Sequence, residues 1–248
     1  MNRPVRGPVL LVVLAAALAS AGCLQKAKPA QPAGFIPPEN LEKPTDLPFQ
    51  KAWRSLANWD RYTEIYIAPF NTEHLREMTW WEKLERGEKV KQDAEELALY
   101  AQTEFREAFA KDPNHRFKVV DLPGPNSLMA EIALTEVVPN KIVLDALGYA
   151  AGPVVGAAGS AAANVQTVTT HSTVAFEARM RDGASKEIVA MFADREQEKY
   201  FPVNLKDLTW YGHAKSIIKE WANQFVKIAN QQPGEIIKDS PLFDLKPW

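Results

Sequence analysis

The chain has 248 residues, a length that suits one large domain or two small ones. Hydrophobic residues make up 46% of it and charged residues 24%, a mixture that excludes wholesale disorder, collagen and a polytopic membrane protein. The 29 basic and 31 acidic residues give a formal net charge of -2, without the basic excess of nucleic-acid-binding proteins, so we expect no nucleic-acid partner. The single cysteine excludes an intramolecular disulfide and a multi-cysteine zinc site.

The first 22 residues have the layout of a secretory signal peptide. Arg3 and Arg6 are their only charged residues, and residues 9–22 form an uninterrupted run of small and apolar residues. This run is too short for a comfortable membrane span. A charged start, a short apolar stretch and small residues before a cleavage site define a signal peptide instead. We therefore predict that residues 1–22 are removed.

The only cysteine, Cys23, directly follows this run, and Ser20-Ala21-Gly22-Cys23 resembles the lipobox of bacterial lipoproteins. In those proteins the thiol carries a diacylglyceryl group and the new amino group is acylated, so the resemblance makes Cys23 the lipid attachment site. Ser20 departs from the usual leucine. Leu24 stands where an aspartate usually causes inner-membrane retention. The resemblance therefore implies a palmitate-type membrane anchor and the periplasmic face of the outer membrane. The alternative is an ordinary signal peptide before an unmodified cysteine.

Residues 23–50 are predicted to form the lipidated N-terminus and a proline-rich tether. Proline removes main-chain donors and favours extended backbone, which makes a semi-stiff spacer from the bilayer. The prolines of this segment are Pro29, Pro32, Pro37, Pro38, Pro44 and Pro48. Residues 51–232 are predicted to form the folded domain, and residues 233–248 a tail that wraps over it.

The first predicted strand covers residues 62–67 and ends at Pro69, because apolar and polar positions alternate along it. Thr79 with Glu82 fits a capping box that opens a helix. The apolar stripe of this helix, spaced by three and four residues, is Val90, Ala94, Leu97, Ala101, Phe105 and Ala108. Residues 112–114, Asp-Pro-Asn, end it.

Two further strands are predicted at residues 117–121 and 128–135, and a hairpin at residues 173–194. The hairpin turn begins at Asp182-Gly183. Its first strand alternates, with one face made by Val174, Phe176, Ala178 and Met180.

The last predicted helix is capped by Thr209 and ended by Pro233-Gly234. Its stripe is Ala214, Ile217, Trp221, Phe225 and Ile228. The element order is therefore β-α-β-β-insertion-β-β-α. This order predicts an α+β sandwich, a mostly antiparallel sheet with helices packed on one face.

An Ala/Gly-rich insertion, residues 146–165, separates the two halves of this pattern. Gly148, Gly152 and Gly156 fall four residues apart and Gly159 follows, so on a helix they would line one face and allow close backbone approach. These four glycines are the candidate interaction residues. Three interpretations stay open: a packed connection, a surface that self-associates or touches the membrane, and a membrane span, which the weakly apolar composition opposes.

The sequence contains no recognisable catalytic motif. Its four histidines lack the spacing of a helical metal site, so we expect no metal and no cofactor. Glu131, Glu177 and Arg179 are expected on the polar face of the sheet as solvated cross-strand charge pairs. An envelope hydrolase would require His213, Asp194 or Glu177 to meet in one concave cluster.

The chain resembles the uncharacterised DUF3313 family of Gram-negative lipoproteins over roughly residues 34 to 230. The segments that carry the resemblance are residues 123–128 (PGPNSL), 176–182 (FEARMRD), 189–195 (VAMFADR) and 210–215 (WYGHAK) with Trp221-Ala222. Asp182-Gly183-Ala184 departs from the commoner turn of the family. The family has no established activity, so the resemblance implies a compartment and a fold but no reaction.

These observations predict a membrane-anchored periplasmic lipoprotein that acts as a non-catalytic binding or assembly component of the cell envelope. Its expected partners are the membrane, reached through N-terminal acyl chains, and an envelope protein or a second copy of the chain. Two alternatives remain. One is an oligomeric secretion or transport accessory that uses the Ala/Gly-rich insertion, and the other is a hydrolase of envelope lipid or glycan.

Overall fold

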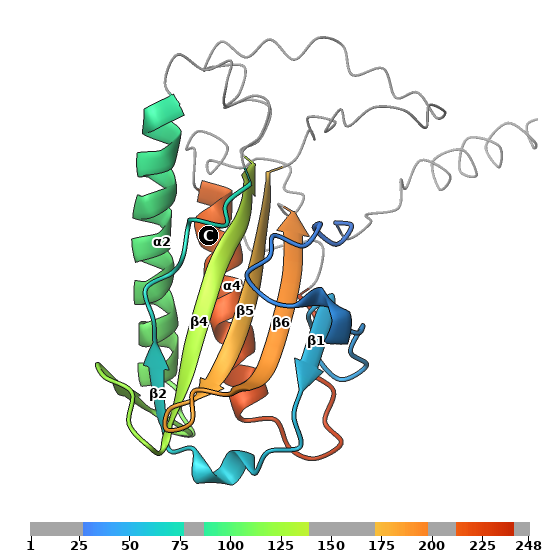
Figure 1. Cartoon of the computed structure of the whole chain (residues 1–248), viewed down its shortest axis with the longest axis vertical. Coiled ribbons are helices and arrows are strands. Elements are labelled where there is room, and N and C mark those ends of the chain that lie inside the picture. Colours follow the sequence, from blue (N-terminus) through green and yellow to red (C-terminus); the bar gives the residue numbers. More distant parts are fainter. Residues whose placement is uncertain (1–26, 77–86, 139–171, 198–211, 241–248) are drawn as a thin grey trace, which may run out of the picture.

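The computed structural model of the protein describes residues 27–76, 87–138, 172–197 and 212–240 (Figure 1). The predicted signal peptide, Cys23 and the helix caps at Thr79 and Thr209 lie outside these residues. So do the Ala/Gly-rich insertion and its four glycines, Gly148, Gly152, Gly156 and Gly159.

Within the described ranges, six strands form one mixed sheet in the order β1-β6-β5-β4-β2-β3 (Figure 1). The neighbours from β1 to β4 are antiparallel, whereas β2 runs parallel to both β4 and β3. The strands are β1 (Lys51–Arg54), β2 (Glu64–Ile67), β3 (Lys118–Val120), β4 (Ser127–Val138), β5 (Thr173–Asp182) and β6 (Ile188–Gln197). The predicted α+β class with a mostly antiparallel sheet is confirmed.

The predicted hairpin is present as β5 and β6. Asp182 closes it: the Asp182 N–H donates to the Glu187 carbonyl (2.9 Å), and Asp182 Oδ1 accepts from the N–H of Ala184 and Ser185. A side chain at Gly183 would place its Cβ 2.1 Å from the Gly124 carbonyl oxygen. Glycine is therefore required here so that the β5–β6 turn can pack against the loop that precedes β4.

Two helices, α2 (Gly87–Ala110) and α4 (Gly212–Ala229), cover one face of this sheet (Figure 1). Their buried residues follow the predicted stripes, with Leu97, Ala101 and Phe105 on α2 and Trp221 and Phe225 on α4. α4 ends at Ala229, before the predicted stop at residues 233–234. Neither described helix has a stretch apolar enough for a transmembrane span.

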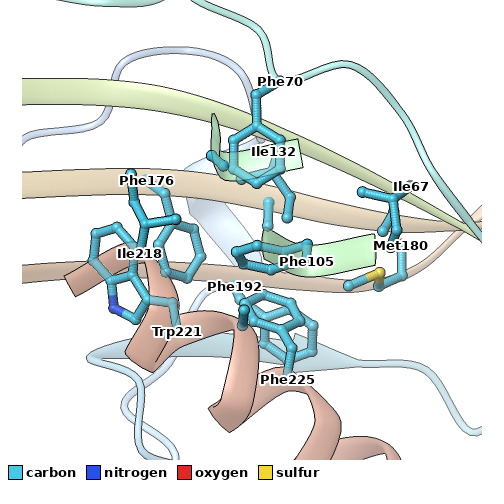
Figure 2. Packing of buried hydrophobic residues seen from close by; sticks show 14 of the residues in the cluster. Ile67, Phe70, Phe105, Ile132, Phe176, Met180, Phe192, Ile218, Trp221 and Phe225 are labelled. Atoms are coloured by element: carbon cyan, nitrogen blue, oxygen red, sulfur yellow. The ribbon is translucent and has the colours of Figure 1, made fainter. Parts of the chain in front are cut away.

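The main hydrophobic core lies between the helices and this sheet face. Figure 2 shows Phe176 and Phe192 of the sheet directed at the side chains of both helices. The ring of Phe176 meets the Trp221 ring edge-on at 4.7 Å, and Phe105 of α2 meets Phe225 of α4 at 5.3 Å. Burial of these aromatic side chains against the sheet stabilises both helices.

The prediction of a semi-stiff, proline-rich tether over residues 23–50 is wrong for residues 27–50, which fold against the sheet. Phe35 and Ile36 are buried on the face opposite the helices, where they contact Ala133 and Met191. Farther along, Phe49 enters the main core, and its ring lies 5.0 Å from that of Phe225. Burial of these apolar side chains outweighs the preference of the surrounding prolines for extended, solvated backbone.

Strand β1 was not among the predicted elements. It is four residues long, and Ala52 exchanges both main-chain hydrogen bonds with Glu42 (3.1 and 2.8 Å). The segment before it therefore turns back along the edge of the sheet and partly covers β1. A strand this short, paired on one side by an isolated bridge, carries too little alternation to be read from sequence.

Candidate functional site

Residues 27–36, called the docked segment below, lie on the sheet face opposite the helices. Glu177 of β5 is only 5% exposed and holds this segment through its main chain. Glu177 Oε1 accepts from the Ala33 N–H (2.7 Å), and Oε2 accepts from the N–H groups of Phe35 (2.9 Å) and Ile36 (3.1 Å). A buried carboxylate is costly unless it is hydrogen-bonded, and here three main-chain donors replace the lost water.

Arg179 continues this contact two residues along β5. Its guanidinium lies over the Phe35 ring, 4.3 Å from the centroid, and its Nη1 donates to the Phe35 carbonyl oxygen (3.1 Å). Glu131 of β4 accepts from Arg179 and also from Nε of Arg181 (3.0 Å). These ion pairs are half-buried beneath the docked segment.

The earlier part of the docked segment reaches the end of the sheet where β4 and β6 finish and β5 begins. The Gln50 Nε2 donates to the Ala27 carbonyl (2.6 Å), and Arg195 Nη1 donates to the Lys28 carbonyl (3.4 Å). Arg195 Nε also donates to the buried Glu136 (2.7 Å). The chain is therefore fixed from Ala27 onward at this end, called the anchor end below.

The anchor end is also where the connection containing the Ala/Gly-rich insertion attaches. Val138, the last residue of β4, is paired with Thr173, the first residue of β5. Thr173 in turn donates to Glu136 (2.8 Å), next to Arg195. The segment that joins β4 to β5 must leave and return within a few residues of the fixed Ala27 and Lys28.

The sequence correctly predicted that Glu131, Glu177 and Arg179 share one face of the sheet, but the expected solvation of that face is wrong. Glu177 is buried, and both of its carboxylate oxygens accept hydrogen bonds from the docked segment. The alternating pattern of β5 revealed the polar face. Nothing in it could show that a segment some 140 residues earlier covers that face.

The cluster required for a hydrolase is not formed by the two carboxylates named for it. In the β5–β6 register, Asp194 pairs with Phe176 while Glu177 pairs with Ala193, so the two acids point to opposite faces. Asp194 accepts from the indole N–H of Trp221 (3.0 Å) on the helix side. His213 lies buried in the first turn of α4. Within the described ranges, no group of three His, Cys, Asp or Glu side chains could hold a metal ion.

A cleft of about 510 Å³ opens at the other end of the sheet. Its floor is apolar and includes Ile65, Met180, Phe192 and Phe225, all shared with the main core. Its rim is polar and includes Arg54, Asp60 and Arg116. β4 separates the two ends by roughly 33 Å, because ten residues at 3.3 Å each join Leu128 to Val138. The sequence did not predict this cleft.

Together, the sheet, the two helices and the docked segment define a single α+β domain, and residues 27–50 belong to this folded unit. The chain belongs to the DUF3313 family of proteins of unknown function, whose model matches residues 31–225. This confirms the resemblance to that family, and the match begins inside the docked segment.

Comparison with solved structures gives two crystal structures of the PelC dodecamer from Paraburkholderia phytofirmans, one of them a variant with methionine in place of a leucine. The similarity covers 73% of this chain and 94% and 97% of theirs, at 9% and 7% identity and a TM-score of 0.39 in both cases. No curated protein matches the chain significantly.

Replacement of Glu177 by glutamine should release the docked segment. A glutamine keeps one acceptor oxygen, so at least one of the three main-chain N–H groups loses its partner, at a cost of about 1–3 kcal/mol where that group is buried. Hydrogen exchange should accelerate at the amides of Ala33, Phe35 and Ile36 while core amides of β5 keep their protection. The exposed Glu187→Gln serves as the control; equal exchange in both variants would contradict the role assigned to Glu177.

The ion pairs of Glu131 should make folding stability depend on pH. Burial raises the pKa of Glu131, but the hydrogen bonds from Arg179 and Arg181 outweigh it and hold the pKa below the ordinary value of 4.5. The stabilisation is therefore full above the unfolded pKa and is lost as the pH falls through the lower folded pKa.

Urea unfolding from about pH 5 to about pH 3 measures this loss. Glu131→Gln should lower the unfolding free energy at the upper pH and flatten its decline toward the lower one. The exposed Glu39→Gln is the matched control. A slope unchanged by Glu131→Gln would show that the cluster contributes nothing to the acid sensitivity.

Proposed function

We propose that the protein is a membrane-anchored lipoprotein on the periplasmic face of the outer membrane, where it acts as a non-catalytic binding or assembly component of the envelope. The fixed position of Ala27 carries this proposal. Only residues 24–26 separate it from Cys23, the proposed acylation site. At no more than 3.6 Å per residue, acyl chains on Cys23 hold the anchor end within about 14 Å of the bilayer.

This short link distinguishes the proposal from that of a domain on a long tether. A spacer of some 27 residues would let the domain explore a large volume, whereas a link of three residues holds one end of the sheet at the membrane surface. A binding or assembly role is supported by the contacts of the polar face. Glu177, which the hydrolase alternative would require, and Arg179 are both engaged by the docked segment.

Replacement of Cys23 by alanine should abolish acylation and release the protein from membranes. Cells fed an alkyne-bearing palmitate should label the natural chain and leave Cys23→Ala unlabelled, and membrane flotation should separate the two forms. Ser20→Ala, which keeps the thiol and a small residue before the cleavage site, is the control and should label normally. A natural chain that carries no label and floats no better than Cys23→Ala would refute the lipoprotein proposal.

An oligomeric secretion or transport accessory is the second candidate. One observation favours it: the connection that holds Gly148, Gly152, Gly156 and Gly159 attaches at the anchor end, beside Lys28 and Arg195. In the proposed orientation this connection starts next to the bilayer, where it is placed to meet other copies, a partner protein or lipid.

Photo-crosslinkers at Val155 and Ala161 test this candidate in intact cells. Adducts between copies of the chain, lost together with the oligomer when Gly152 and Gly156 are changed to leucine, are the expected result. The same changes to alanine are the control, because alanine still permits close helix packing. Lipid adducts alone would assign the insertion to the membrane, and an unchanged sedimentation profile in the leucine variant would reject self-association through these glycines.

A further inference from the structure

The cleft at the end of the sheet opposite the anchor end has the dimensions of a ligand site. Its volume of about 510 Å³ lies within the range of about 300–1,000 Å³ typical of small-molecule pockets. The apolar floor penetrates between the sheet and the two helices, since Ile65 comes from β2, Phe192 from β6 and Phe225 from α4. Side chains of this floor offer a ligand apolar contact and no hydrogen bond.

Arg116 gives the rim of this cleft an available positive charge. Its Nη1 donates to the Tyr62 carbonyl (2.7 Å) and its Nη2 to the Trp59 carbonyl (2.9 Å), and the guanidinium lies over the Phe117 ring. A guanidinium has five N–H donors, so three remain. Across the part of the chain that the structure describes, no carboxylate lies within ion-pair distance of this group.

The other charges of the rim differ from Arg116 in this respect. Arg54 is paired with Asp46 and also donates to Gln231 (3.0 Å). Asp60 is exposed at the start of a short helical turn, Trp59–Arg61, and its N–H is capped by the Asn58 side chain. Of these three charged rim residues, Arg116 is the half-buried one that two carbonyls hold in place, so the fixed charge that the rim offers to a ligand is positive.

We propose that this cleft binds a fatty acid, with the alkyl chain on the apolar floor and the carboxylate on Arg116. A single unbranched chain matches a floor without polar side chains, because methylene groups gain from burial and require no hydrogen bond. A carboxylate matches a planar guanidinium that is already oriented by two carbonyls and an aromatic ring. This assignment requires no acyl group on Cys23 and stands apart from the proposed anchoring.

Photolabelling of the full chain with diazirine-bearing hexadecanoic acid tests the proposal. The chain is mixed with phosphatidylcholine nanodiscs, irradiated and digested, and adducts are located by mass spectrometry. We expect adducts on peptides that contain Ile65, Phe192 or Phe225. Excess hexadecanoate should suppress them at least about tenfold more than hexadecyltrimethylammonium, which has the same chain and the opposite charge. Equal suppression by both would overturn the assignment to a fatty acid.

Two variants, each with a matched control, separate the site of the alkyl chain from that of the carboxylate. Ala229→Phe fills the cleft and should abolish the adducts, while Ala184→Phe adds the same bulk in the exposed β5–β6 turn and should not. Arg116→Gln should weaken labelling about tenfold, the usual effect of losing a charged hydrogen bond, and Arg54→Gln should change it little. Circular dichroism verifies that each variant folds. If Ala229→Phe does not fold, the comparison of Arg116→Gln with Arg54→Gln alone tests whether the cleft binds the fatty acid.

Three further outcomes would overturn the proposal. Adducts confined to residues outside the cleft would show partition onto another surface. Labelling of Arg116→Gln equal to that of the natural chain would remove the carboxylate contact. Adducts that form only when the chain is truncated after Ser240 would assign the cleft to the apolar C-terminal residues of the chain itself.

Discussion

The carboxylate of Glu177 is the interaction on which the arrangement of this domain depends. Buried beneath the docked segment, it replaces its hydration with three main-chain N–H donors, and without them its charge would be expensive to bury. The same contact fixes where the N-terminal residues lie. Phe35 and Ile36 then cover Ala133 and Met191, so both faces of the central strands are buried. One acidic side chain thus holds part of the predicted tether as a layer of the folded domain.

The two ends of the sheet differ: chain segments attach at one end, and a cleft opens at the other. At the anchor end, Lys28 and Arg195 lie beside the ends of β4 and β6, where the Ala/Gly-rich connection and the proposed membrane link attach. At the opposite end, the side chains of both helices and the sheet separate to leave the cleft beside Arg116. In the proposed orientation the long strands act as a spacer, and any ligand of the cleft binds well away from the bilayer surface.

Local patterns predicted most of the framework. The stripes of α2 and α4 and the alternation of β5 are periodic signals, and the buried side chains follow them. The position of residues 27–50 was not predicted, because the six prolines of this segment favoured a tether. Four buried apolar residues hold the segment on the domain: Phe35, Ile36, Leu47 and Phe49. The cleft was not predicted for a different reason. Its walls come from elements far apart in the chain, and no local sequence pattern indicates that these elements lie next to one another.

The separation in sequence between Glu177 and Phe35, 142 residues, has a consequence for biogenesis. A chain crosses a membrane N-terminus first, and contacts between distant residues form late because loop closure must come before them. For the proposed lipoprotein this means that the docked segment lacks its Glu177 partner until β5 has been exported, an interval in which the proposed acylation of Cys23 can take place. Under the same proposal, completion of the fold would bring the domain closer to the membrane, because the docked segment would then no longer be part of the link between Cys23 and the sheet.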